Sequence, residues 1–62
     1  MTYEEAIEEV RKDALEFGER MFLYRDKFPF RGDCEWFISS TEWSDWIYTC
    51  CPNGASIERL GP

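Results

Sequence analysis

The sequence predicts an α+β protein in which one long N-terminal helix packs on a three-stranded antiparallel meander. Two patterns lead to this prediction. In the first half, apolar residues recur every three or four positions, which is the period of a helix with one buried side. In the second half, apolar and polar residues alternate between turn-forming residues, which is typical of short strands. A helix with one apolar side and a sheet with one apolar face bury both by packing in two layers.

The predicted helix covers residues 2–28. Thr2 is a favoured N-cap, and Glu5 three positions later completes a capping box. Pro29 ends the helix, because the residue before a proline avoids helical backbone angles. The apolar stripe consists of Tyr3, Ile7, Val10, Ala14, Phe17, Met21, Tyr24 and Phe28.

Gly18 is the weak point of this helix, since glycine in a helix interior costs roughly 1 kcal/mol relative to alanine. Beyond it, the segment from Met21 to Tyr24 is apolar on every side. The helix is therefore expected either to kink near Gly18 or to be covered on more than one side. As an alternative, the stripe pairs with a second copy of the chain, although its many aromatic residues fit a helix-on-sheet core better.

Three strands are predicted after the helix, over about residues 34–40, 44–51 and 55–60. A three-residue loop at 41–43 pairs the first two and sets Ile38 across from Trp46. Residues 51–55 are the strongest turn signal, because proline, asparagine and glycine follow in the order that a turn prefers. The chosen register gathers on one face Cys34, Trp36, Ile38, Trp46, Tyr48 and Cys50. On the opposite face of the sheet it leaves Glu35, Ser39, Asp45 and Thr49.

The chain is short and acidic. Sixty-two residues form a single domain, over residues 1–62, with a modest core. Thirteen acidic and seven basic side chains leave a net charge of −6, which repels nucleic acid and anionic membranes and favours a basic protein surface. The ordinary alternative is that the charge only keeps a small domain soluble.

The residue types argue against an enzyme or a metal protein. Because histidine is absent, every arrangement that needs an imidazole base or ligand is excluded. The three cysteines have no Cys-x-x-Cys spacing, so neither a metal nor another cofactor is expected. A Cys34–Cys50 disulfide under oxidation is the side alternative to reduced, buried thiols. The N-terminus has no signal-peptide pattern and no apolar run spans a bilayer, so the expected location is cytoplasmic.

The candidate site is an acidic surface with aromatic anchors. Carboxylates on the helix recur at about one turn, roughly 5–6 Å, which is near the phosphate separation along a nucleic-acid strand. Aromatic rings that the core cannot hide would anchor a partner. The acidic set is Glu5, Glu8, Glu9, Asp13, Glu16, Glu19, Glu35, Glu42 and Asp45. The aromatic set is Phe22, Phe37 and Trp43. The alternative is a solvated face without a partner.

A very short, histidine-free, ring-rich acidic domain resembles the small inhibitors encoded by phages and mobile elements, anti-CRISPR proteins among them. The resemblance lies in build over the whole chain and rests on no motif. It implies a monomeric viral inhibitor that suppresses antiviral defence in the host cytoplasm. Such a protein binds a basic surface of a nucleic-acid-binding complex, by DNA mimicry or by protein contacts, and touches neither nucleic acid nor membrane itself. The alternative function is a structural or regulatory module that self-associates through the helix seam and exposed rings.

Overall fold

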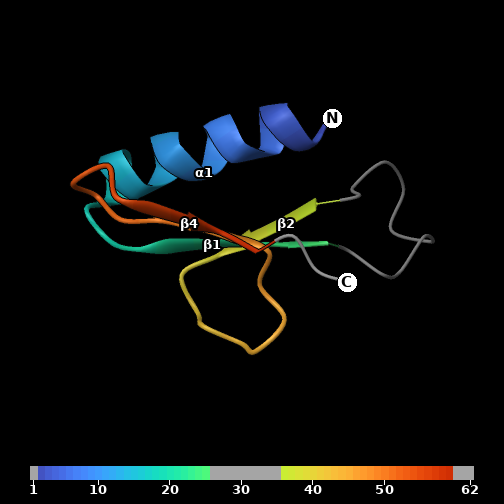
Figure 1. The fold of residues 1–62 in the computed structure, drawn as a ribbon. Coiled ribbons are helices and arrows are strands. Elements are labelled where there is room, and N and C mark those ends of the chain that lie inside the picture. Colours follow the sequence, from blue (N-terminus) through green and yellow to red (C-terminus); the bar gives the residue numbers. More distant parts are fainter. Residues whose placement is uncertain (1, 26–35, 60–62) are drawn as a thin grey trace.

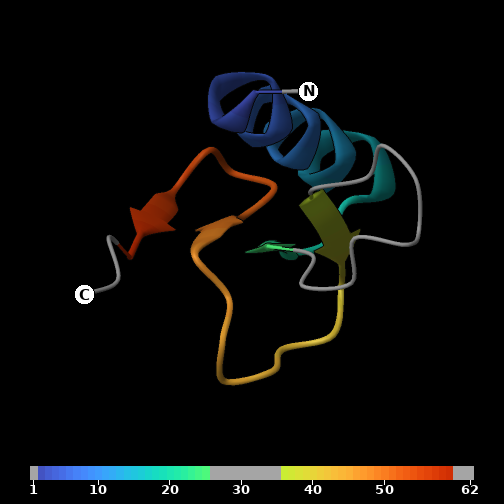
Figure 2. The same ribbon diagram turned by 90° about the vertical axis from the view of Figure 1, so that its right-hand side faces the viewer.

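The computed structural model describes residues 2–25 and 36–59 (Figure 1). The fold is α+β, with a four-stranded antiparallel sheet in the order β2-β1-β3-β4. The helix lies across one face of the sheet, and the loop that joins β2 to β3 lies on the other (Figures 1 and 2). The elements are α1 (Tyr3–Phe17), β1 (Met21–Arg25), β2 (Trp36–Ser39), β3 (Tyr48–Cys50) and β4 (Ser56–Glu58).

Helix α1 begins with the predicted capping box. The Thr2 backbone N–H donates to Glu5 Oε1 at 2.8 Å, and the Glu5 N–H donates to the Thr2 hydroxyl at 3.2 Å. These bonds satisfy two amides that no helical carbonyl can reach. The predicted start of the helix is therefore confirmed.

The predicted end of the helix is wrong. Instead of kinking, α1 stops at Phe17, and Gly18 caps it in the left-handed conformation with φ 67° and ψ 29°. The Gly18 N–H donates to the Ala14 carbonyl at 3.0 Å, which closes the last turn. A glycine that reverses the chain after a helix is a common stop signal, because only glycine adopts this backbone region without steric cost.

The second half of the predicted helix is the central strand of the sheet. In β1, Leu23 lies opposite Ile38 of β2 on one side and opposite Tyr48 of β3 on the other. Four successive β1 residues are buried, because the helix covers one face of the strand and the loop covers the other. Met21 belongs to the core under the helix and Tyr24 to the core under the loop, so these two predicted stripe residues face opposite ways.

Strand β1 also overturns the predicted meander. It lies between β2 and β3, so the register that set Ile38 across from Trp46 does not form. The predicted face survives in part, although β2 and β3, each antiparallel to β1, run parallel to one another and not antiparallel as in the predicted hairpin. Four of its residues line the core under the helix, namely Trp36, Ile38, Tyr48 and Cys50. Trp46 instead joins Phe22 and Tyr24 under the loop. Phe28, Cys34 and Glu35 lie outside the described residues.

The predicted turn at 51–55 is confirmed. The Gly54 N–H donates to the Cys51 carbonyl at 3.0 Å, and the Cys51 N–H donates to the Ala55 carbonyl at 2.7 Å. Gly54 takes the positive φ of 94° that the turn requires, and Asn53 Oδ1 accepts the Ala55 N–H at 3.0 Å. The turn brings β4 back beside β3 as the edge of the sheet.

The main core lies between α1 and the sheet. The helix contributes the small residues Ala6, Val10 and Ala14, each 0% exposed. They pack on larger sheet residues, including Leu23 and Tyr48. Apart from Phe17, which is 61% exposed, the apolar stripe of the helix is therefore occupied within the chain, and a second copy could use it only if the helix left the sheet.

Candidate functional site

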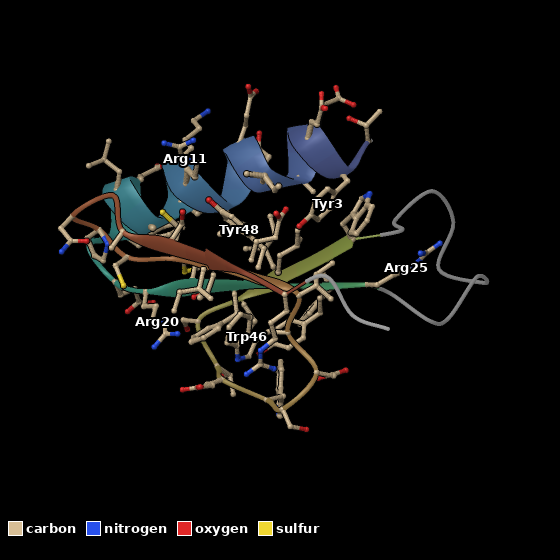
Figure 3. All side chains as sticks on the ribbon, viewed as in Figure 1. Tyr3, Arg11, Arg20, Arg25, Trp46 and Tyr48 are labelled. Carbon is tan, nitrogen blue, oxygen red and sulfur yellow. The ribbon has the colours of Figure 1, made fainter. Side chains whose placement is uncertain are left out.

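The outer side of α1 concentrates the negative charge of the protein. The helix carries six acidic and two basic residues, so it accounts for −4 of the net −6. Because its apolar side is buried against the sheet, these carboxylates point away from the core (Figure 3). Of the predicted acidic set, Glu5, Glu8, Glu9 and Glu16 are exposed and Asp13 is half-buried.

The acidic surface of the helix is interrupted. Arg11 and Lys12 are both exposed on α1, between Glu9 and Asp13 in the sequence (Figure 3 labels Arg11). Glu19 does not continue the row, because the helix ends before Gly18. The net negative charge of the helix therefore lies in its first half, because the two basic and two acidic residues of the second half cancel.

Glu5 already has a structural role at the start of the helix. Hydrogen bonding, first from the Thr2 backbone amide and then from its side chain, holds the pKa of the Glu5 carboxyl below its usual range. Glu8, Glu9 and Glu16 have no such role in the capping box and are better probes of binding.

Two further acidic residues of the predicted set lie on the opposite side of the molecule. Glu42 and Asp45 are exposed in the loop between β2 and β3, which covers the sheet face away from the helix. The sheet separates them from the helix carboxylates (Figure 2). The predicted acidic set therefore forms two surfaces and not one.

Of the three predicted aromatic anchors, one is buried and two are exposed. Phe22 is only 3% exposed, so its expected place on the surface is wrong; its ring packs beside Trp46, with 6.0 Å between centroids. Phe37 and Trp43 are 41% and 49% exposed. Their rings lie 6.1 Å apart on the loop side of the sheet. Whether they bind a partner stays a prediction.

Tyr24 holds these two rings in place. It is 4% exposed and lies beneath them, with centroids 6.0 Å from Phe37 and 5.2 Å from Trp43. Its hydroxyl donates to the Thr41 carbonyl at 2.5 Å and accepts the Trp43 N–H at 2.8 Å. The loop backbone is thus fastened to the central strand through one phenol oxygen.

The other rings on this face lie under arginine side chains. The Arg59 guanidinium carbon lies 3.6 Å from the Trp46 ring centroid, and that of Arg20 lies 4.8 Å from the Phe22 centroid. Arg20 Nε also donates to Thr49 Oγ1 at 3.0 Å (Figure 3 labels Arg20 and Trp46). Sequence reasoning missed these residues, because it placed Arg20 inside the predicted helix over residues 2–28, and because nothing local relates Arg59 to Trp46.

A polar contact ties the helix to the far edge of the sheet. The Tyr3 hydroxyl donates to Glu58 Oε2 of β4 at 2.7 Å. Burial, followed by this bond to the Glu58 carboxylate, raises the pKa of Tyr3 to about 12. The Glu58 carboxylate therefore has a structural role, and we do not count it as part of the partner-binding acidic surface.

The described cysteines are Cys50 and Cys51. Cys50 is buried and Cys51 half-buried, and both thiols are free. Across 2–25 and 36–59, no cluster of cysteine and carboxylate side chains is placed to hold a metal ion. Nor does any helix in that part of the chain have the length and apolar character needed to cross a membrane. Comparison with protein-family models, curated protein sequences and solved structures gives no match for this chain.

Proposed function

We propose that this protein is a non-enzymatic acidic inhibitor that binds a basic surface of a nucleic-acid-handling complex through the outer side of α1. The main support is the concentration of −4 of the net −6 charge on one helix. The fold uses the other side of that helix, where Ala6, Val10 and Ala14 are fully buried. Apart from Glu5, the outer carboxylates are in excess of what the helix start requires.

The proposed mechanism is competition for a groove that normally holds nucleic acid. Carboxylates one helical turn apart, roughly 5–6 Å, can meet lysine and arginine side chains spaced for phosphates. Their field speeds encounter with a basic partner, and it weakens as salt screens the charges. The small inhibitors of the anti-CRISPR type, which this chain resembles in build, include proteins that act in this way.

The test measures whether the chain prevents duplex DNA from binding to each of a panel of purified CRISPR effector complexes. We expect inhibition of at least one complex, relieved by added DNA and by salt. Glu9→Lys should weaken inhibition at least about tenfold, because it reverses a charge at the centre of the surface. Reversing Glu8, Glu9 and Glu16 together should abolish it.

Glu19→Lys is the matched control, because it makes the same change in net charge at an exposed position beyond the helix. It should weaken inhibition much less than Glu9→Lys. Equal losses would show that only total charge matters, and inhibition that survives the triple reversal would exclude the helix as the interface. If no complex in the panel is inhibited, the proposed target class is wrong.

The alternative function, self-association, has a smaller structural basis than the sequence suggested, because the helix seam is covered by the sheet. The exposed apolar residues left on α1 are Leu15 and Phe17, at 74% and 61%, near its C-terminal end. Sedimentation at micromolar concentration tests this alternative. A dimer that Phe17→Ser dissociates would favour it over the inhibitor, whereas a monomer removes it.

A further inference from the structure

The loop side of the sheet exposes a pair of aromatic rings that none of the described elements covers completely. Phe37 projects from β2 and Trp43 from the loop, and the two rings lie 6.1 Å apart. Each also contacts Tyr24, yet 41% of Phe37 and 49% of Trp43 remain exposed. The two rings therefore lie side by side and partly exposed on the sheet face that the loop covers, away from the acidic helix.

This surface is held in shape before any ligand arrives. The Tyr24 hydroxyl binds the Thr41 carbonyl and the Trp43 N–H, and the Thr41 N–H donates to Ser39 Oγ at 3.1 Å. These bonds fasten both ends of the 41–43 segment to neighbouring strands. A ligand that binds here does not have to order the loop, so little affinity is lost to conformational entropy.

Among the described residues, two carboxylates flank the ring pair in the sequence, while Arg59 Nη1 donates to the Ser44 carbonyl at 2.9 Å and brings one positive charge to the same loop. Glu42 precedes Trp43 directly, Asp45 follows it by two residues, and both are exposed. Aromatic faces attract cations through their quadrupole, and nearby carboxylates add a longer-range attraction of the same sign. Rings beside carboxylates therefore suit a cationic ligand and disfavour phosphate.

On the loop side of the sheet, two other rings already contact arginine side chains of this chain. Arg59 and Arg20 place their guanidinium carbons 3.6 Å from the Trp46 centroid and 4.8 Å from the Phe22 centroid. Two of the ring surfaces on this side of the sheet thus take arginine from within the chain. Among the residues that the structure describes, no guanidinium lies over Phe37 or Trp43.

We propose that Phe37 and Trp43, flanked by Glu42 and Asp45, bind an arginine side chain of a basic partner segment. The planar guanidinium stacks on the rings while its N–H groups face the carboxylates, which lysine matches less well. This site goes beyond the proposed function, because it lies on the other side of the sheet from α1 and uses none of the helix carboxylates.

The experiment is a titration of the full ¹⁵N-labelled chain with a hexa-arginine peptide, followed by the indole N–H signals of the three tryptophans. We expect the Trp43 indole signal to shift more than those of Trp36 and Trp46. A hexa-lysine peptide of equal charge should shift it less. An unmoved Trp43 signal, or equal shifts with both peptides, would overturn the proposal.

Variants then assign the site. Trp43→Ala, which lacks the indole signal and is followed through the Phe37 backbone amide, should weaken binding at this site about fivefold, and the double variant Glu42→Gln and Asp45→Asn should do the same. If Trp43→Ala also shifts the backbone amide signals of the loop, Phe37→Ala is used in its place. It removes a ring of the site, should weaken binding similarly, and leaves the hydrogen bonds of the Tyr24 hydroxyl intact.

The control is Glu8→Gln with Glu9→Gln, which removes the same charge from the helix and should leave the Trp43 shift intact. A control that weakens the Trp43 response as much as the loop variants would overturn the arginine site. The inhibitor proposal is judged on DNA competition by effector complexes, so either proposal can fail while the other stands.

Discussion

Leu23 and Tyr24 are neighbours in the central strand, and they show how differently the two faces of the sheet are built. Leu23 is fully buried under the helix, where it belongs to the apolar core with Val10 and Ala14. Tyr24 is 4% exposed under the loop, where its hydroxyl makes two bonds to the loop backbone. An amphipathic helix can seal a sheet face by apolar packing alone, whereas a loop carries backbone groups that require partners.

The difference in construction leaves different surfaces to the solvent. The helix seals its face of the sheet and presents carboxylates outward. The loop covers its face only in part, so Phe37 and Trp43 stay exposed beside carboxylates. The molecule therefore has an acidic surface built on a rigid element and an aromatic surface built on a fastened loop.

The largest expected effect comes from the helix side of the strand. Leu23→Ala should lower the free energy of unfolding by about 2–5 kcal/mol, because it opens a cavity between the helix and three strands. Urea denaturation followed by circular dichroism measures the loss. Ile57→Ala, at a residue 56% exposed, is the control and should cost less than about 0.5 kcal/mol. If Leu23→Ala prevents folding, Leu23→Val, expected to cost about 1 kcal/mol, gives the measurement instead.

A smaller and more local effect is expected on the loop side. Tyr24→Phe keeps the ring but leaves the Trp43 N–H and the Thr41 carbonyl without their partner, so it should cost about 1–3 kcal/mol. Hydrogen exchange should speed up at the Trp43 amide before it does so in α1. Tyr48→Phe removes a hydroxyl that bonds to no described side chain or backbone group, and should cost less than about 0.5 kcal/mol. Equal losses of stability in the two variants would contradict the claim that hydrogen bonds stabilise the loop side and apolar packing the helix side.

The smallest expected effect comes from Gly18, where the helix ends and the chain turns toward the central strand. Gly18→Ala should destabilise the protein by about 1–2 kcal/mol, because Gly18 has a positive φ of 67°. No atom within 4 Å would meet the added methyl group, so the cost is that of the backbone alone. Gly18→Asn should cost less, since asparagine tolerates this conformation. In a helix running through Gly18 the alanine variant would be more stable by about 1 kcal/mol, so thermal denaturation distinguishes the two by sign.

The elements that could be predicted are those with local causes. The capping box needs only Thr2 and Glu5 three residues apart, and the turn at 51–55 needs only its own residues. The failed predictions were non-local. Met21 and Tyr24 fit a helical stripe as well as they fit a strand, because spacings of three and four are common in any apolar run. Gly18 and the apolar run after it carried the signal of a helix stop followed by a buried strand.

The candidate site shows the same division. The excess of acid on the helix follows from residues close in the sequence, so it could be predicted. Neither the separation of Glu42 and Asp45 from that helix nor the burial of Phe22 could be, because both depend on which face of the sheet each segment covers. The pairing of Arg59 with Trp46 requires the loop and the end of β4 to meet, which no local spacing reveals.

By itself, the sequence determined the α+β class, the start of the helix, the turn at 51–55 and the acidic outer surface of α1. These features follow from backbone conformations and side-chain periods within a few residues. Only the tertiary structure decided that Met21–Arg25 enters the sheet between β2 and β3. There the strand buries both of its faces and pairs along both edges, and that gain exists only once the distant strands have assembled around it.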